Sequence, residues 1–191
     1  MPDYRRAFVP GGTFFFTLVT FDRAPILTEP AARSILRGAI ETCRQRWPFD
    51  IDAFALLPDH LHAILTLPPG DADFSRRWAL IKKEFTKQWL DAGGAARPVS
   101  AAKHRDRRAG VWQQRFWEHV VRDADDLHAH LDYVHYNPVR HGLAACPHAW
   151  PYSSFDRCRR AGFYEDDWLC TCAGRAATPP DFAHLPLRDM E

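Results

Sequence analysis

The chain has 191 residues, of which 46% are hydrophobic and 26% are charged. This composition is typical of a globular protein and excludes a disordered polyampholyte, and the length fits one ordinary domain better than two. The longest strongly apolar stretch is far shorter than the roughly twenty residues that a bilayer-spanning helix needs. The first residues also lack the apolar segment of a secretory signal, so we expect a cytoplasmic protein without a membrane partner.

The charges are distributed unevenly along the chain. The formal net charge is only +1, but residues 76–122 hold twelve basic and four acidic side chains. Residues 161–191 hold six acidic side chains and two basic ones. A basic middle followed by an acidic tail indicates a surface for nucleic acid, with solvated helix and loop faces as the common alternative explanation.

Five cysteines are present, at positions Cys43, Cys146, Cys158, Cys170 and Cys172. Their odd number, without a secretory signal, predicts reduced thiols rather than disulfides. Four of the five follow residue 145, which leaves a zinc site open as a hypothesis. The spacing of Cys170 and Cys172 argues against that site, because an ordinary zinc knuckle has two or more residues between its cysteines.

The N-terminal half predicts a strand, a helix and two further strands. Aromatic and β-branched residues favour a strand over residues 13–21. Pro30 suits the first turn of a helix whose apolar residues recur at helical spacing until the chain reaches Trp47. Residues 49–57 and 60–67 then predict two strands, and the Pro-Asp turn between them predicts that they pair antiparallel.

The C-terminal half predicts two long helices and one strand. Large apolar residues at spacings of three and four predict an amphipathic helix over residues 74–89. Residues 91–110 are rich in Gly, Ala and basic residues and predict a loop. Residues 111–121 predict a fourth strand, and acidic residues around Asp123 favour the start of a third long helix. That helix is expected to end by Pro138, because the residue before a proline resists helical geometry.

This order of elements predicts an α+β fold. The expected architecture is a ferredoxin-like (split βαβ) antiparallel sheet with helices on one face, plus an added helix that carries Tyr133. We expect residues 1–160 to form this domain. Residues 161–191 are expected to form a C-terminal tail without an assigned role.

Two histidines in the third predicted strand are spaced for a shared site. Side chains alternate across a strand, so His60 and His62 project on one face while Leu61 points into the core. Two imidazoles on one face make half of a divalent metal site. An ordinary pair of core or surface histidines is the common alternative, and the pair alone does not decide between them.

The third helix adds a tyrosine and an amide. His130, Tyr133 and Asn137 are spaced three and four residues apart, so they lie on one face of the helix. A separate apolar stripe is suited to packing on the sheet, and it consists of Leu127, Leu131 and Val134. A helix packed in this way holds Tyr133 and Asn137 over the edge of the face that carries His60 and His62. A tyrosine that anchors its hydroxyl at the rim of the core is the common alternative for Tyr133.

Five segments of the chain resemble one known family. Residues 56–68 (LLPDHLHAILTLP) resemble the histidine–hydrophobe–histidine motif of the HUH endonucleases. Residues 131–143 (LDYVHYNPVRHGL) resemble the tyrosine helix of single-tyrosine transposases. Residues 4–23, 70–85 and 112–123 are similar to stretches of the REP-associated tyrosine transposases. Because these motifs agree in order and spacing, the resemblance is far more specific than the histidine pair alone.

The resemblance implies a fold and a set of site residues. An HUH single-tyrosine transposase domain, here residues 1–160, has the antiparallel ferredoxin-like sheet expected above. The nucleophile of the family corresponds to Tyr133, and its metal-holding side chains correspond to His60, His62 and Asn137. The implied cofactor is a divalent metal, Mg²⁺ or Mn²⁺, and the imidazole ligands shift the preference toward Mn²⁺.

The resemblance also implies an activity. Such an enzyme is a metal-dependent endonuclease and strand-transferase that acts on single-stranded DNA at hairpin or palindromic repeats, through a 5′-phosphotyrosine intermediate. Because the covalent bond conserves the energy of the phosphodiester, rejoining needs no nucleotide cofactor. The acceptor of the phenol proton is open between metal-bound water, His130 and His135. Tyr136, three residues after Tyr133, is expected to pack or to stack on a base rather than to react.

Basic and aromatic residues are expected to contact the single-stranded or hairpin DNA. Arginines near the N-terminus resemble the sequence-reading arm of the family, and those of the basic middle suit phosphates. Trp112, Phe116 and Trp117 interleave with these charges and suit stacking on bases, although Phe116 suits the core equally well. The expected DNA-binding residues are Arg5, Arg6, Lys82, Lys83, Arg107, Arg108, Arg115, Trp117 and Arg140.

Two other functions compete with this one. One is a hairpin-DNA-binding or regulatory module on the same fold. Such a module would not need the tyrosine, the histidine pair and the amide at the same time, so their joint presence favours the enzyme. A zinc hydrolase needs further ligands soon after His62, and the next residues supply none. Three questions stay open at this point: the DNA sequence that is recognised, the role of the acidic tail, and the choice between a monomer and a homodimer. One hypothesis for the tail is that it covers the DNA site.

Overall fold

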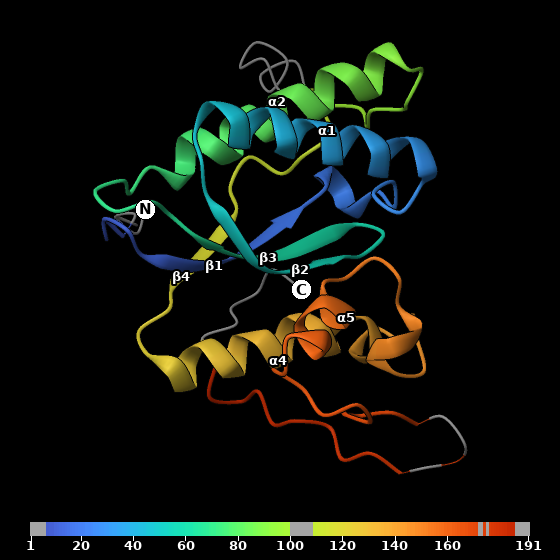
Figure 1. Cartoon of the computed structure of the whole chain (residues 1–191). Helices are drawn as coiled ribbons and strands as arrows, with labels where there is room; N and C mark the ends of the chain where they lie inside the picture. The colour runs from blue at the N-terminus through green and yellow to red at the C-terminus, as the bar shows by residue number, and fades with distance from the viewer. Residues whose placement is uncertain (1–6, 100–108, 172–173, 175, 186–191) are drawn as a thin grey trace.

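Four strands form an antiparallel sheet (Figure 1). The computed structural model describes residues 7–99, 109–171, 174 and 176–185. The strands are β1 (Thr13–Val19), β2 (Asp50–Leu56), β3 (His60–Thr66) and β4 (Trp117–Val120). Their order across the sheet is β2–β3–β1–β4, and every neighbouring pair is antiparallel. The α+β prediction is confirmed.

Two long helices cover one face of this sheet (Figure 1). Helix α1 (Pro30–Arg46) has a proline in its first turn, as the sequence predicts. Helix α2 (Phe74–Asp91) is capped by Asp73, whose carboxylate accepts a 2.9 Å hydrogen bond from the backbone N–H of Arg76. The apolar stripe of α2 is buried at every position, namely Phe74, Trp78, Ile81, Phe85 and Trp89. No helix in the described part of the chain is long and apolar enough to cross a membrane.

The third long helix lies on the opposite face. Helix α4 (Ala124–Arg140) begins after Asp123, whose carboxylate accepts a 2.9 Å hydrogen bond from the N–H of Asp126. It packs against β2 and β3 through Leu131 and Val134, which belong to a second core cluster. The sheet therefore lies between two helical layers, and the added helix is alone on its side of the sheet among the three long helices (Figure 1).

A backbone segment after α4 covers the free edge of β2. Two short helices follow α4, namely η2 (Pro147–Ala149) and α5 (Phe155–Arg160). A third short helix, η1 (Phe21–Arg23), follows β1. Between η2 and α5, the carbonyl of Tyr152 accepts a bond from the Leu56 N–H at 2.8 Å. The N–H of Ser154 donates to the Phe54 carbonyl at 2.8 Å.

The fourth strand is shorter than the sequence predicts. Of residues 111–121, only Trp117–Val120 form β4, and Trp112 makes an isolated bridge with Thr20. The ammonium of Lys82 donates a hydrogen bond to the carbonyl of Gln113 at 2.5 Å. This carbonyl is therefore bonded to a side chain instead of a strand partner. The preceding loop lies partly outside the described residues.

The third helix is longer than the sequence predicts. Helix α4 continues through Pro138 and ends at Arg140, whereas the proline was expected to stop it. A proline removes its own N–H from the helical hydrogen-bond ladder and crowds the carbonyl four residues earlier, but its own carbonyl still accepts. Here the last turn is closed on both sides of it, because His141 N–H donates to the Asn137 carbonyl at 3.0 Å and Leu143 N–H donates to the Pro138 carbonyl at 2.9 Å.

Candidate active site

Two buried histidines lie side by side on β3, on the face that α4 covers. Alternation along the strand directs His60 and His62 to this face, while Leu61 packs into the core beneath α1 and α2. Both imidazoles are at most 1% exposed, and their ring centroids are 5.0 Å apart. The strand thus presents two nitrogen-bearing rings to a space that solvent does not reach.

Each imidazole is oriented through its Nδ1 atom. Asp59 Oδ1 lies 2.7 Å from His60 Nδ1, and Thr17 Oγ1 lies 2.9 Å from His62 Nδ1. Burial alone would raise the pKa of Asp59, but hydrogen bonds from His60 and Arg23 outweigh it and hold that pKa at about 2. The carboxylate is therefore ionised at neutral pH, and it favours the proton of His60 on Nδ1. In the neutral ring, Nε2 of His60 is then the nitrogen that can ligate a metal.

Burial sets the protonation state of the second imidazole. Desolvation, followed by the nearby His60 and His141 imidazoles, lowers the pKa of His62 well below its ordinary value. His62 is therefore neutral at physiological pH. A neutral imidazole at this position suits a divalent cation, because a protonated ring would repel it.

Helix α4 places a tyrosine and an amide against the histidines. The ring of Tyr133 meets that of His62 edge-on, with centroids 5.2 Å apart. One turn later, Asn137 Oδ1 lies 3.4 Å from His60 Nε2. The structure therefore brings together the four residues that the sequence singled out, from one strand and one helix.

An arginine lies at the tyrosine hydroxyl. Arg140 is two helical turns after Tyr133, and its Nη1 atom donates to the phenolic oxygen at 3.4 Å. Its guanidinium carbon is 5.6 Å from the centroid of the tyrosine ring. The sequence singled out Arg140 for DNA contact but not for this position, although the spacing of seven residues already places both side chains on one helix face.

The C-terminal tail covers the tyrosine. The ring of Phe182 meets that of Tyr133 edge-on at 5.3 Å, and it lies 6.0 Å from the ring of Tyr136. Leu185 is buried in the same apolar cluster. Tyr133 is consequently only 1% exposed. No local sequence pattern signals this contact, because the tail reaches Tyr133 from a distant part of the chain.

Comparison with known proteins identifies the family. The chain is 40% identical over 168 residues to a REP-associated tyrosine transposase of Escherichia coli (strain K12), which is 88% of this chain and 91% of that protein. A relative from Haemophilus influenzae is also 40% identical over 168 residues, which is 93% of its length. The chain belongs to the REP-associated tyrosine transposases. No family model matches it.

A solved structure of the family shares the fold. The structure of a REP-associated tyrosine transposase bound to a REP hairpin superposes with a TM-score of 0.74 at 38% identity, and the match covers 96% of both chains. The ferredoxin-like architecture expected from the sequence is thus confirmed at the level of the whole chain.

The two histidines considered as proton acceptors are bonded elsewhere. His135 is buried, with Nδ1 2.9 Å from the Tyr164 hydroxyl and Nε2 2.8 Å from Ser154 Oγ. Burial lowers the pKa of His135 to about 3. His130 Nδ1 bonds the Asp126 carbonyl at 2.8 Å. Both nitrogens of His135 and this nitrogen of His130 are therefore engaged away from the tyrosine hydroxyl.

The expected DNA-binding residues that the structure describes lie on both sides of the sheet. Arg5, Arg6, Arg107 and Arg108 lie outside the described residues. Lys82 and Lys83 are on α2, across the sheet from α4, and Lys82 bonds the carbonyl of Gln113.

Only some of the remaining DNA-binding candidates are open to solvent. Arg115 and Arg140 are exposed, and Arg140 borders the tyrosine site. Trp117 is half-buried against Phe15, with ring centroids 5.6 Å apart, and is stacked with His119.

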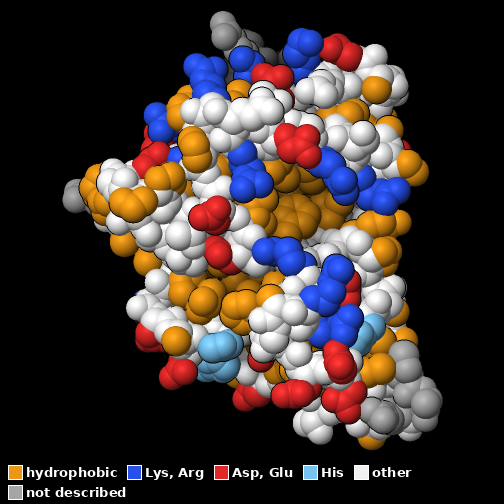
Figure 2. Space-filling view, viewed as in Figure 1, with side chains coloured by type: hydrophobic (Ala, Val, Ile, Leu, Met, Phe, Trp, Pro, Cys, Tyr) orange, Lys and Arg blue, Asp and Glu red, His pale blue; other side chains and the backbone are white. Residues whose placement is uncertain are grey.

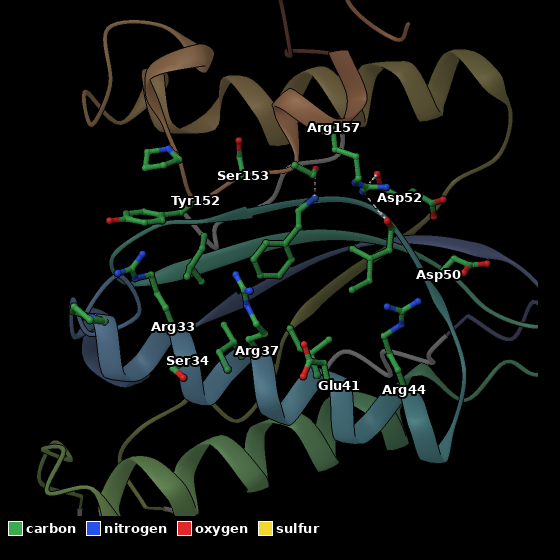
Figure 3. A pocket seen from close by; sticks show the side chains of 18 residues that line it. Arg33, Ser34, Arg37, Glu41, Arg44, Asp50, Asp52, Tyr152, Ser153 and Arg157 are labelled. Atoms are coloured by element: carbon green, nitrogen blue, oxygen red, sulfur yellow. Dashed lines mark hydrogen bonds between the residues drawn. The ribbon is translucent and has the colours of Figure 1, made fainter. Parts of the chain in front are cut away.

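A separate groove lies between α1 and the covered edge of β2. It has a volume of about 1140 Å³, and Figure 2 shows its apolar floor with basic side chains around it. Arg33, Arg37 and Arg44 line it from α1, and Glu41 is interspersed among them (Figure 3). Because α1 and α4 lie on opposite faces of the sheet, the groove is separate from the Tyr133 site, and no sequence motif predicts it.

Proposed function

We propose that this chain is a metal-dependent endonuclease and strand-transferase of hairpin-forming, palindromic single-stranded DNA, with Tyr133 as the nucleophile. The observation that carries the proposal is the junction of β3 and α4, where Tyr133 contacts His62 and Asn137 reaches His60. The relative that shares the fold is bound to a REP hairpin, which supports the substrate class.

The donor set fits a divalent cation. His60 and His62 supply imidazole nitrogens, and their rings are held at Nδ1 by Asp59 and Thr17, while Asn137 supplies an amide oxygen. Two nitrogens and one oxygen suit Mn²⁺ better than Mg²⁺, which prefers oxygen ligands. When bound, such an ion polarises the scissile phosphate and offsets the charge that develops on it.

The covalent step is carried by the tyrosine. The phenolic oxygen of Tyr133 attacks the phosphorus, forms a 5′-phosphotyrosine and releases a free 3′-hydroxyl. The guanidinium of Arg140 lies beside the phenolic oxygen, where its positive charge would offset the negative charge of the phosphate during attack. The return attack by a 3′-hydroxyl of another strand restores the phosphodiester and frees Tyr133.

A second candidate is a hairpin-DNA-binding module without cleavage. The observation in its favour is the burial of Tyr133 beneath Phe182, which keeps a phosphate from the hydroxyl in this conformation. The enzyme therefore requires the segment around Phe182 to move, whereas the binding module does not.

The decisive experiment is cleavage of labelled hairpin oligonucleotides with Mn²⁺, resolved on a denaturing gel. We expect a covalent adduct that disappears in Tyr133→Phe and persists in the matched control Tyr136→Phe. The control removes the same hydroxyl three residues away on the same helix. Hairpin binding without any adduct, across a broad set of repeats and metals, would favour the binding module.

A further inference from the structure

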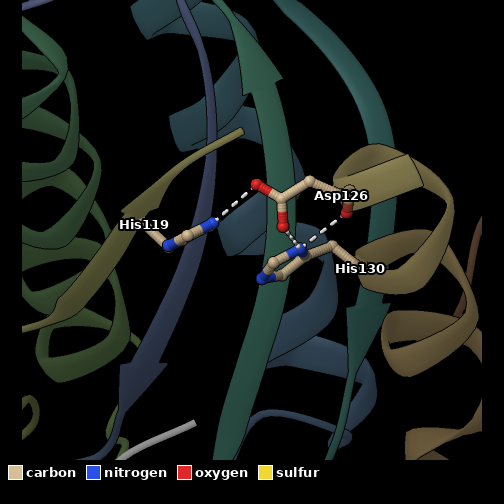
Figure 4. Close-up of side chains that lie close together, drawn as sticks. All are labelled: His119, Asp126 and His130. Atoms are coloured by element: carbon tan, nitrogen blue, oxygen red, sulfur yellow. Dashed lines mark hydrogen bonds and ion pairs between the residues drawn. The ribbon is translucent and has the colours of Figure 1, made fainter. Parts of the chain in front are cut away.

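A second group of possible ligands lies beside the candidate active site. It comprises His119 from β4 and Asp126 and His130 from α4 (Figure 4). His119 Nε2 lies 2.9 Å from Asp126 Oδ2, and His130 Nδ1 lies 3.1 Å from Asp126 Oδ1. One potential ligand atom from each residue lies within 4.8 Å of the others. This His–Asp–His cluster shares no residue with the set His60, His62 and Asn137.

The cluster holds buried polar atoms whose bonding capacity is unused. His130 is fully buried, and among the described residues its Nε2 atom has no hydrogen-bond partner. Asp126 Oδ1 is also buried, and its contact in the described part of the chain is His130 Nδ1 at 3.1 Å, which directs its hydrogen bond to the backbone carbonyl of Asp126 at 2.8 Å. A carboxylate oxygen that faces an imidazole nitrogen without a bond is unusual in a protein interior, where such atoms normally have partners. The carboxylate of Asp126 lies between two imidazoles, and this arrangement points to a cationic ligand.

We propose that His119, Asp126 and His130 form a second metal site, which takes a borderline transition-metal dication of the Zn²⁺ class. Two imidazole nitrogens and one carboxylate oxygen are a ligand set that such ions use, and a water molecule completes four-coordination. Mg²⁺ fits poorly, because it prefers oxygen ligands alone. In the metal-free form His119 Nε2 lies against the Asp126 carboxylate and His130 Nδ1 bonds the Asp126 backbone carbonyl, so each imidazole nitrogen that binds a metal would release its proton to solvent.

The position of the cluster allows entry of an ion from solvent. The guanidinium of Arg122 bonds Asp126 Oδ2 at 3.0 Å, and its side chain is 68% exposed. The Arg122 guanidinium supplies the positive charge that a metal would bring to Asp126. Because its side chain is exposed, it can swing away from Asp126 into solvent. Metal and Arg122 therefore compete for the same carboxylate.

A metal at this site would fix β4 to α4 about one turn before the tyrosine. The ring of Phe15 lies between the two sites, with its centroid 4.9 Å from that of His130, 5.5 Å from His62 and 5.8 Å from Tyr133. The site would thus hold α4 in the position that brings Tyr133 to His62. The inference goes beyond the proposed cleavage activity and does not depend on it.

The test uses Co²⁺ as a spectroscopic probe for Zn²⁺. The full chain is stripped with a chelator and titrated, and bound metal is counted by elemental analysis and by visible absorption. We expect Asp126→Asn to remove one class of bound Co²⁺ and the control Asp125→Asn to retain it, because Asp125 is exposed one residue away. His60→Gln is expected to retain the same class, which separates it from an ion at the candidate active site.

A second variant keeps the test decisive if Asp126→Asn fails to fold by circular dichroism. Arg122→Gln keeps all three ligands and removes the competing charge, so Co²⁺ is expected to bind this class more tightly than in the unchanged chain. Loss of this class in His60→Gln, its retention in folded Asp126→Asn, or weaker binding in Arg122→Gln would each overturn the proposal. The cluster would then be a hydrogen-bonded link between β4 and α4.

Discussion

The two histidine clusters use similar ligands on the same face of the sheet, and they differ in charge. The candidate active site combines His60 and His62 with the neutral amide of Asn137. The His–Asp–His cluster instead contains the carboxylate of Asp126. A dication at the first site would meet no charged ligand directly, since Asp59 lies behind the His60 ring, whereas Asp126 would offset part of the charge at the second by direct contact. The comparison shows how one face can carry a site suited to DNA and a site suited to holding two elements together.

Removal of one imidazole from each cluster gives the largest expected difference. In His62→Ala we expect no covalent adduct, because the variant loses a metal donor and the ring that packs on Tyr133. As for other large-to-small changes in a core, we expect a loss of about 2–4 kcal/mol in the free energy of unfolding. His119→Ala should lower adduct formation less, since its ring does not belong to the Tyr133 site. Gel assays and urea unfolding measure both effects, and adduct at the unchanged rate in His62→Ala would contradict the assignment.

A change of charge at the first site comes next. Asn137→Asp gives it the carboxylate that distinguishes the second cluster. We expect tighter Mn²⁺ binding and adduct formation slower by about tenfold to a hundredfold, because a negative charge then faces the scissile phosphate. The adduct rate, measured against Mn²⁺ concentration, separates the two effects. Asn137→Gln keeps the amide and serves as the control, and an Asp variant as fast as the original chain would refute the charge argument.

The cover over the first site offers a smaller effect of opposite sign. Phe182→Ala removes the ring that lies against Tyr133, so we expect several-fold faster adduct formation with saturating Mn²⁺. Phe163→Ala is the control, because this ring is 53% exposed and the chemical change is the same. If both variants cleave at the rate of the original chain, Phe182 does not limit access to the tyrosine.

Acid should destabilise the fold through its buried imidazoles. Burial lowers the pKa of His135 to about 3, and it also lowers the pKa of His62 and His130. In the unfolded chain the pKa of a histidine is about 6.5. Around and below that pH the unfolded state therefore binds more protons than the folded state. Stability therefore falls with decreasing pH, by up to about 1.4 kcal/mol per pH unit for each such histidine.

The pH effect is measured by urea unfolding from neutral to mildly acidic pH. His135→Gln should make the slope shallower by about one proton. His135 belongs to neither cluster, so this variant isolates the effect of burial from that of metal binding. An unchanged slope in a folded His135→Gln protein would show that His135 is not held neutral.

Local periodicity accounts for what could be predicted from the sequence. The two-residue spacing of His60 and His62 and the four-residue spacing of Tyr133 and Asn137 depend only on strand and helix geometry. The structure has both pairs where those periods place them. The apolar stripe of α2 was predictable for the same reason, and the motifs in chain order were sufficient to indicate the family.

Features that depend on long-range pairing could not be predicted. The His–Asp–His cluster needs the register of β4 against β1, where His119 lies opposite Phe15, and the packing of α4 over it. Neither is encoded in a short spacing. The contact of Phe182 with Tyr133 also depends on residues far apart in the sequence. So does the start of β4 at Trp117 instead of residue 111, because the strand pairs only where β1 lies beside it.

The covered edge of β2 has a consequence for self-association. Exposed sheet edges are the usual points at which copies of a protein pair and aggregate. Here residues 152–154 bond the middle and end of β2, and the guanidinium of Arg157 bonds the carbonyls of Ile51 and Asp52 at 2.8 and 2.7 Å. The opposite edge is β4, with only four residues. A continuous sheet through two copies is therefore disfavoured, and strand exchange between nascent chains should be rare.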